Sequence, residues 1–207
     1  MTSIQAAVLG ILQGLTEFLP VSSYAHLVLL PRLLGWTYQG LAFDVALHWG
    51  TLLALTVCYG VEGLRLLRAG LRRDGSEESR LFWGLVLGTL PAVVAGLALK
   101  DVVESSFHEP RQIAGALMVF GLLLGVADRK ADAGALPLGE LGLKGCLIIG
   151  LAQALALIPG VSRSGVTITA GLFLGLSRVE AARFSFLLSA PVVLGAGLLK
   201  LPEAAAA

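Results

Sequence analysis

The chain has 207 residues, of which 56% are hydrophobic and only 14% are charged, with 26 glycines and a formal net charge of +1. A soluble domain of this length needs more charged residues to cover its surface, and a nucleic-acid-binding domain carries a basic face, so both classes are excluded. The mean hydropathy of +0.84 instead predicts an integral membrane protein. The two cysteines, Cys58 and Cys146, lie in apolar runs and indicate neither a disulfide nor a metal site.

The chain opens with two apolar segments, residues 4–18 and 25–34, each shorter than the ~20 residues that a spanning helix needs. They are joined through Pro20, Val21, Ser22 and Ser23. Proline ends a helix, and serines permit a tight turn. We therefore expect two half-helices that form a re-entrant loop, which is tolerated at membrane depth where it lines a wet or protein-buried cavity.

Three segments long enough to span a bilayer are expected next, at residues 45–61, 81–99 and 112–127. The half-helix pattern then recurs, because residues 143–158 and 166–176 join through a second polar turn at residues 159–165. A fourth span is expected at residues 184–199. The sequence thus predicts an all-α polytopic membrane protein with two re-entrant helix-turn-helix loops.

The two loop regions also resemble each other. The run Gly-Ile-Leu-Gln-Gly-Leu at residues 10–15 aligns with Gly-Leu-Ala-Gln-Ala-Leu at residues 150–155, and each leads to a proline and a pair of serines. With three spans between them the copies would be inverted, an architecture that places a site near the membrane midplane. We predict one membrane domain with a first repeat at 1–127 and a second at 144–207; chance similarity of Leu/Gly/Ala-rich stretches is the alternative.

Basic residues give the expected orientation. One predicted side carries ten of them, in loops 61–80, 128–144 and 177–183, whereas Arg32, Lys100 and Arg111 fall on the other side. The positive-inside rule places the ten in the cytoplasm and the N-terminus outside. The basic loops fall on one side only if the two half-helix pairs, at residues 4–34 and 143–176, each enter and leave the membrane on the same side.

The polar turns carry the chemistry. An ionised side chain at mid-membrane costs about 2.5–3.5 kcal/mol, so Glu17 and Arg163 are expected to line a polar cavity. Arginine pairs bidentately with phosphate, and the backbone N–H groups of residues 160–164 with the hydroxyls of Ser162 and Ser164 are suited to hold the remaining oxygens. Glu17 is expected to hold a divalent cation or to act as a base. His26 either attacks phosphorus or activates Ser23 or a water molecule.

Structural explanations for the same residues stay open. In these explanations Glu17 pairs with Arg163 and serves only to stabilise the fold, and Ser22 and Ser23 serve only to cap the following helix. An Arg163 without a partner this deep in an apolar segment would require an anion. Two further expectations are that Gln13 and Gln153 hydrogen-bond to each other across the pseudo-symmetric centre, and that Asp44 and His48 lie at the membrane boundary.

Two long motifs resemble a known family. QGLTEFLPVSSYAHL at residues 13–27 and PGVSRSGVTITAGLFLGLSR at residues 159–178 are similar to the signatures of the bacitracin-resistance type undecaprenyl-diphosphate phosphatases. FDVALHWGTLLAL at 43–55 and GTLPAVVAGL at 88–97 also fit that pattern. The resemblance covers residues 4 to about 200 and implies removal of the terminal phosphate of undecaprenyl diphosphate, which recycles the lipid carrier for cell-wall synthesis and confers bacitracin resistance.

The resemblance also implies roles for individual residues. The expected catalytic residues are Glu17, Ser23, His26 and Arg163, with Glu17 also the ligand of a divalent cation, Mg²⁺ or alternatively Ca²⁺. The expected substrate-binding residues are Gln13, Thr16, Ser22, Gly160, Ser162, Ser164 and Thr167. The enzyme is expected in the bacterial inner membrane with its site facing outward, and a homodimer is left open. The competing function is a flippase or transporter of the same lipid carrier, because inverted repeats with broken helices are also a transporter architecture.

Two departures from the family pattern stand out. Gln13 occupies a position where many relatives have a second glutamate, so a two-carboxylate metal site is not expected. The family's second half also continues with two further spans, whereas this chain ends with Leu201, Pro202, Glu203 and four alanines. The second repeat is therefore expected to be truncated.

Overall fold

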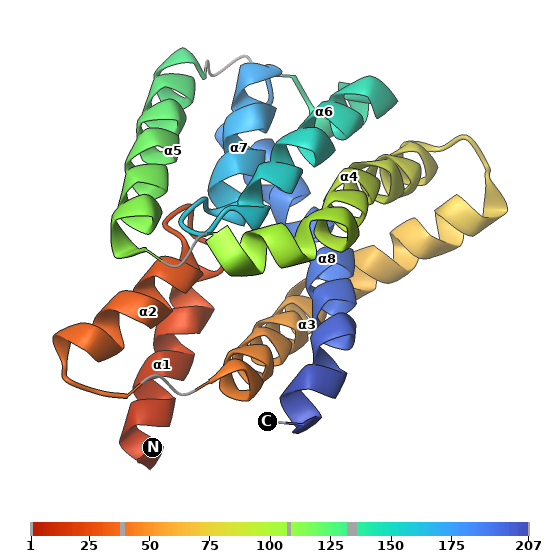
Figure 1. Ribbon diagram of the computed structural model, residues 1–207. Coiled ribbons are helices and arrows are strands. Elements are labelled where there is room, and N and C mark those ends of the chain that lie inside the picture. Colours follow the sequence, from red (N-terminus) through yellow and green to blue (C-terminus); the bar gives the residue numbers. More distant parts are fainter. Residues whose placement is uncertain (1, 38–39, 107–108, 132–135, 207) are drawn as a thin grey trace.

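The computed structural model describes residues 2–37, 40–106, 109–131 and 136–206, and within these ranges the side chains of residues 41, 100–106 and 202–206 are not described. Regular structure in the described ranges is helical, apart from one isolated bridge between Leu136 and Leu176. In chain order (Figure 1) the elements are α1 (Ser3–Thr16), α2 (Ser23–Leu33), α3 (Leu41–Arg72), α4 (Glu77–Ser106), α5 (Pro110–Lys130), the 3-10 turn η1 (Leu138–Glu140), α6 (Gly142–Ala154), the 3-10 turn η2 (Leu155–Leu157), α7 (Arg163–Phe173) and α8 (Arg178–Ala206).

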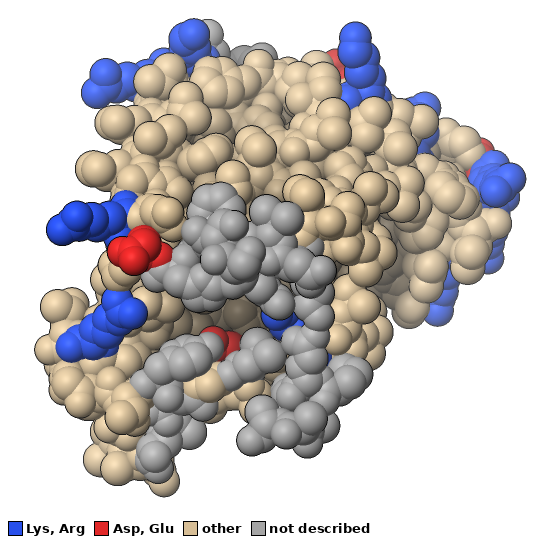
Figure 2. All heavy atoms as spheres, in the orientation of Figure 1, with Lys and Arg blue, Asp and Glu red and all other residues tan. Residues whose placement is uncertain are grey.

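Four of these helices, α3, α4, α5 and α8, are long and apolar enough to cross a membrane. They coincide with the four spans expected from hydropathy, and the shorter α1, α2, α6 and α7 coincide with the expected half-helices. Large apolar side chains cover much of the exterior, among them Val57, Val94 and Leu122. On the face shown in Figure 2, charged side chains lie mainly at the edges and most of the surface is uncharged. The all-α membrane architecture is confirmed.

Helix α3 is longer than expected. Residues 61–72 were expected to lie in a loop, but the helix continues to Arg72 and ends only where Arg73 adopts a left-handed conformation with φ of 52°. No proline interrupts the helical pattern before Asp74 and Gly75, and Gly63 and Gly70 alone do not end the helix at the edge of its apolar stretch. The Nε1 of Trp83 donates to the carbonyl of Gly70 at 3.2 Å and ties the extension to α4.

The two polar turns end their helices as expected and start the next ones with serine caps. Ser22 has a positive φ of 63°, and its Oγ accepts from the N–H of Ala25 at 3.5 Å. Ser162 accepts from the N–H of Gly165 at 3.1 Å. Each cap satisfies a backbone donor that the first turn of a helix leaves without a partner. As a result, α2 and α7 both begin inside the protein.

The core lies where α6, α7 and α8 meet, and its centre contains Ile149, Leu176, Phe184 and Leu188, none of which exceeds 2% exposure. Helix α4 packs closely on α6 at two glycines. A Cβ at Gly150 would lie 2.3 Å from the carbonyl oxygen of Gly88, a distance that backbone atoms cannot accommodate without moving apart. The absence of a side chain at Gly150 therefore sets the α4–α6 spacing.

Gly150→Ala is expected to destabilise the protein by about 1–3 kcal/mol, the usual cost of overpacking a well-packed interior. The measurement is thermal unfolding of the purified protein in detergent. Gly121→Ala is the matched control, because a Cβ at Gly121 meets no atom within 4 Å and alanine favours a helix. Equal unfolding temperatures for the two variants would contradict the close approach of α4 and α6.

Candidate functional site

Glu17 directly follows α1 and is the centre of a buried polar cluster. Its side chain is 8% exposed. Its Oε1 accepts from the Nη2 of Arg163 at 2.9 Å, and its Oε2 accepts from the Oγ of Ser23 at 2.7 Å and from the Nε2 of Gln13 at 3.0 Å. Residues from the two polar turns, 146 positions apart in the case of Arg163, therefore meet at one carboxylate.

Arg163 is the first residue of α7 and is held on two sides. Its Nη2 pairs with Glu17, and its Nη1 donates to the carbonyl of Ser185 in α8 at 3.2 Å. The pairing with Glu17, one of the alternatives that the sequence left open, is present, and the carboxylate from the other turn neutralises Arg163. The guanidinium is 13% exposed, so it is both fixed in position and largely shielded from water.

The two serines of the first turn have different roles, one as a helix cap and one as a partner of Glu17, which the sequence had left open. Ser22 is the N-cap of α2, whereas the hydroxyl of Ser23 points to Glu17. A hydroxyl that donates to a buried carboxylate is arranged for proton transfer to that carboxylate. Capping and site chemistry are thus separated onto neighbouring residues.

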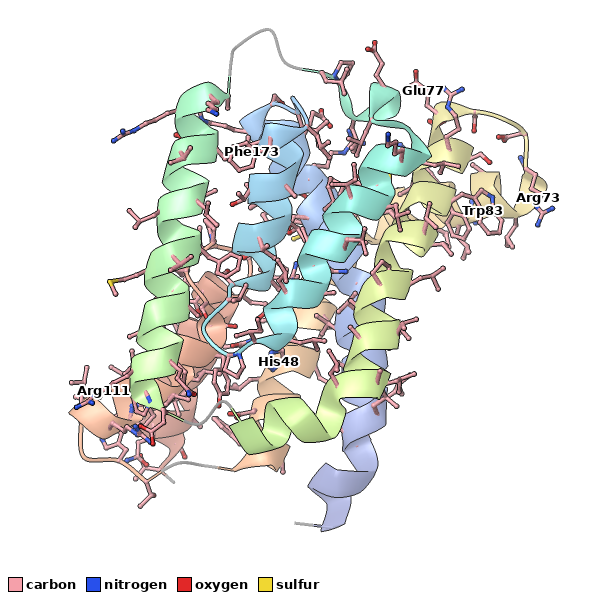
Figure 3. The ribbon with its side chains drawn as sticks, turned by 45° about the horizontal axis from the view of Figure 1, so that its top comes forward. His48, Arg73, Glu77, Trp83, Arg111 and Phe173 are labelled. Carbon is pink, nitrogen blue, oxygen red and sulfur yellow. The ribbon has the colours of Figure 1, made fainter. Side chains whose placement is uncertain are left out.

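His48 is a member of the cluster that the sequence did not reveal. It was expected at the membrane boundary, but its Nε2 lies 3.7 Å from the Oε2 of Glu17, and its Nδ1 donates to the carbonyl of Asp44 at 2.8 Å. Figure 3 labels His48, whose side chain is 37% exposed, so it lies at the edge of the buried cluster. The only sequence signal for its place in the cluster was its position in the segment FDVALHWG, which fits the family pattern. Hydropathy could not reveal it, because hydropathy does not show which face of α3 meets α1.

His26 is oriented by a backbone contact at the start of α2. Its Nδ1 donates to the carbonyl of Ser22 at 2.9 Å, which orients the ring. Among the interactions of the described residues, none joins His26 to Glu17, Ser23 or Arg163. The structure therefore brings Glu17, Ser23 and Arg163 into contact and leaves the imidazole of His26 outside that contact.

The remaining hydroxyls of the second turn hold the two turns together. Ser164 donates to the carbonyl of Leu19 in the first turn at 2.8 Å, and its Oγ lies 3.2 Å from that of Ser162. The hydroxyls of Thr167 and Ser185 share a hydrogen bond of 2.7 Å between α7 and α8. Thr16 donates to the carbonyl of Leu12 at 2.7 Å. The contacts of Ser164 and Thr167 fix the backbone around Arg163, whereas that of Thr16 lies within α1.

Gly160 brings the second turn against α5. Its φ is 96°, a conformation that favours glycine, and a Cβ there would lie 2.4 Å from the carbonyl oxygen of Ile113. Any side chain at this position would push the turn away from α5. The glycine thus fixes the path of the chain into α7.

Gln13 and Gln153 do not bond to each other, so that prediction is wrong. Gln13 donates to Glu17, and Gln153 donates to the carbonyl of Gly88 at 3.4 Å. The amide of Gln13 is thus bound one turn along its own segment, and that of Gln153 is bound by α4. The Oε1 atoms of both are buried and have no hydrogen-bond partner among the described residues.

Helix ends add to the electrostatics of the cluster. Helices α2 and α7 begin at Ser23 and Arg163, so the first residues of two helices contact Glu17 through their side chains. The N-terminus of a helix favours negative charge. The described residues contain no group of three His, Cys, Asp or Glu side chains that could hold a metal ion. A buried cluster with one guanidinium and two helix N-termini is suited to an anion.

Comparison with known proteins identifies the family. Residues 6–207 match the sequence model described as "Bacitracin resistance protein BacA". The chain belongs to the BacA family. Proteins named undecaprenyl-diphosphatase are similar to it over almost its whole length: that of Pelotomaculum thermopropionicum is 54% identical over 203 residues, covering 98% of this chain and 76% of the relative. Those of Elusimicrobium minutum and Geobacter sulfurreducens are 50% and 53% identical, with 98% and 99% of this chain and 78% of each relative covered. These BacA relatives confirm the resemblance seen in the two motifs.

Proposed function

We propose that this chain is an undecaprenyl-diphosphatase, which hydrolyses undecaprenyl diphosphate to undecaprenyl phosphate and inorganic phosphate. The reaction returns the lipid carrier to cell-wall synthesis and gives resistance to bacitracin. The observation that carries the proposal is the contact of Glu17 with Arg163 and Ser23, the first residues of α7 and α2, in a chain about half identical to proteins of that name.

The cluster supports a mechanism in which the substrate replaces Glu17 as the partner of Arg163. The Nη2 of Arg163 already donates to Glu17, so a phosphate that takes this donor displaces the Glu17 contact. Arginine binds phosphate in a planar, bidentate manner. Once released, the Glu17 carboxylate is free to take the proton of the attacking hydroxyl.

The attacking hydroxyl is that of Ser23 or of a water molecule, with His26 as the alternative nucleophile or base. Attack forms a bond to the terminal phosphorus, and the bond to the bridging oxygen breaks and leaves undecaprenyl phosphate. When Ser23 or His26 is the nucleophile, water then hydrolyses the phosphoenzyme. The backbone of Gly160 and the side chains of Gln13, Thr16, Ser22, Ser162, Ser164 and Thr167 are the groups proposed to surround the diphosphate.

A divalent cation, Mg²⁺ or Ca²⁺, fits this site only together with the substrate. Glu17 offers a carboxylate once Arg163 turns to the phosphate, and Gln13 offers a buried Oε1 that has no hydrogen-bond partner among the described residues. Mg²⁺ is commonly bound through one or two carboxylates and substrate phosphates. When bound, such a cation neutralises charge on the diphosphate.

The placement in the membrane follows from the same elements. The half-helix pairs α1–α2 and α6–α7 are proposed as re-entrant loops of two inverted repeats, meeting near the midplane. The basic ends of α3, α5 and α8 are proposed to face the cytoplasm of a bacterial inner membrane, so that the first loop opens outward. A homodimer is compatible with this arrangement.

The test is phosphate release from undecaprenyl diphosphate by the purified chain in detergent, with Mg²⁺ or with EDTA. We expect release with Mg²⁺ and a loss of at least about tenfold with EDTA, reversed by added Mg²⁺, because the cation neutralises charge as the phosphate transfers. If EDTA does not change phosphate release, the proposed role of the cation is contradicted and the proposed hydrolysis still stands. Binding of the lipid without release would contradict the phosphatase and favour a flippase.

A further inference from the structure

Helix α3 is longer than a bilayer requires, and its arginines gather toward one end. Its 32 residues rise about 48 Å. Even at a tilt of ~40°, the upper end of the usual range, they cover about 37 Å of the membrane normal, more than the ~30 Å hydrocarbon core. Arg65, Arg68 and Arg72 lie toward the C-terminus of the helix, and Arg73 is its cap. An arginine is costly inside the core, so this end of α3 lies in the head-group region.

The same end presents an exposed apolar face. Leu66 and Gly70 are buried and turn a neighbouring face toward the rest of the protein. Leu64, Leu67 and Leu71 recur at intervals of three and four residues, so they share one face of the helix. They are 47%, 42% and 71% exposed. Because these leucines lie level with the arginines, the apolar face reaches the boundary between hydrocarbon and head groups.

A basic face lies beside the apolar one. Arg65, Arg68 and Arg72 repeat the leucine spacing one residue further on, about 100° around the helix. All three are exposed. Among the residues that the structure describes, none of the three belongs to an ion pair. This part of α3 is therefore an amphipathic helix whose polar side is basic.

The acidic residues that flank the basic face have partners of their own. The Oε1 of Glu62 accepts from the Nη2 and Nε of Arg183 at 2.6 and 3.0 Å. The Oδ1 of Asp74 accepts from the N–H and the hydroxyl of Ser76 at 3.0 and 2.6 Å. Between Glu62 and Asp74 the chain carries four arginines and no acidic residue. The positive charge is thus available to an anion outside the protein.

The tip of the α3–α4 hairpin carries a residue typical of the membrane interface. The guanidinium of Arg73 lies over the ring of Trp83, 5.3 Å from its centroid, and the indole N–H donates to the carbonyl of Gly70 at 3.2 Å. Figure 3 shows Arg73 and Trp83 at this tip, and Figure 2 shows basic side chains at the corresponding edge of the molecule. Tryptophan is enriched at the level of the lipid head groups. The tip therefore matches the same depth as the basic face.

We propose that residues 64–73 bind anionic phospholipids of the surrounding bilayer, with the leucine face among the acyl chains and the arginine face on the lipid phosphates. Basic amphipathic helices bind membranes through both apolar burial and attraction to anionic lipids. Arginine suits a phosphate because it offers a planar fork of donors. In the orientation proposed above, these lipids belong to the cytoplasmic leaflet, whose surface is negatively charged. The Glu17 cluster takes no part, so the inference does not depend on phosphatase activity.

The test is lipid binding to the purified chain in neutral detergent, measured by native mass spectrometry. The probes are dioleoyl phosphatidylglycerol and dioleoyl phosphatidylcholine, which share their acyl chains and differ in net charge. We expect the wild type to bind phosphatidylglycerol at least about tenfold more tightly. The triple variant Arg65→Gln, Arg68→Gln, Arg72→Gln is expected to lose most of this preference. The double variant Leu67→Gln, Leu71→Gln is expected to bind both lipids more weakly.

The matched control removes three other exposed basic residues, Arg129→Gln, Lys130→Gln and Lys144→Gln, from the end of α5 and the start of α6. It lowers the net charge by the same amount and leaves α3 unchanged, so we expect it to keep the preference. Both triple variants replace only exposed side chains, where substitutions have little effect on stability.

Three results would overturn the inference. One is equal binding of the two lipids by the wild type. Another is an equal loss of preference in the two triple variants, which would show attraction to net charge alone. The third is displacement of phosphatidylglycerol by millimolar glycerol 1-phosphate, which would assign the arginine face to a soluble phosphate. Preference lost only in the α3 triple variant, and not displaced by glycerol 1-phosphate, would support it.

Discussion

Glu17→Gln is expected to reduce phosphate release by about 10²–10⁴-fold, the usual contribution of a positioned proton acceptor. Glutamine preserves the size of the side chain, its amide oxygen can still accept from Arg163, and its amide N–H can donate to the hydroxyl of Ser23. It cannot take up a proton at neutral pH, and it removes the charge that a cation would bind. The measurement is kcat for undecaprenyl diphosphate in detergent at saturating substrate.

The same variant must be checked for folding, because its arginine partner remains buried. Removal of one charge of a buried ion pair leaves the other uncompensated, at a cost of about 3–5 kcal/mol. In Glu17→Gln the amide oxygen still accepts from Arg163, so we expect a smaller loss and a folded protein. A folded Glu17→Gln with wild-type kcat would show that another group takes the proton.

Arg163→Ala is expected to lower kcat by about 10³-fold or more, in the range lost when an arginine that stabilises a transferring phosphoryl group is removed. We expect Arg163→Lys to recover little of this activity. A lysine presents a single point charge, whereas the guanidinium binds Glu17 with Nη2 and the Ser185 carbonyl with Nη1 from a rigid plane. The kinetics of both variants on undecaprenyl diphosphate test this expectation.

Arg183→Ala is the control, since Arg183 forms an ion pair with Glu62 away from the charged cluster. Its side chain is 41% exposed, so the lost pair is expected to cost about 1 kcal/mol or less. Activity in Arg183→Ala close to wild type, beside the loss in Arg163→Ala, would separate the phosphate contact from a general loss of stability. Similar losses in both would contradict a special role for Arg163.

The sequence by itself determined the class of the protein, its helices and its chemical groups. Apolar runs of sufficient length predict α3, α4, α5 and α8 because the bilayer sets the length of a spanning helix. Pro20 and the serines around the two turns end and start helices through local backbone effects, which need no distant partner. The motifs containing Glu17 and Arg163 also identified the family, because charged residues are rare within such apolar sequence.

Only the tertiary structure decided which of these groups meet. Hydropathy showed that His48 lies in a helix, but the packing of α3 beside α1 brings it within 3.7 Å of Glu17. The pairing of Arg163 with Glu17 and the separate partners of Gln13 and Gln153 likewise depend on contacts between distant segments. Local sequence sets where helices start, stop and carry charge, whereas their relative positions follow from close packing of side chains that are far apart in the chain.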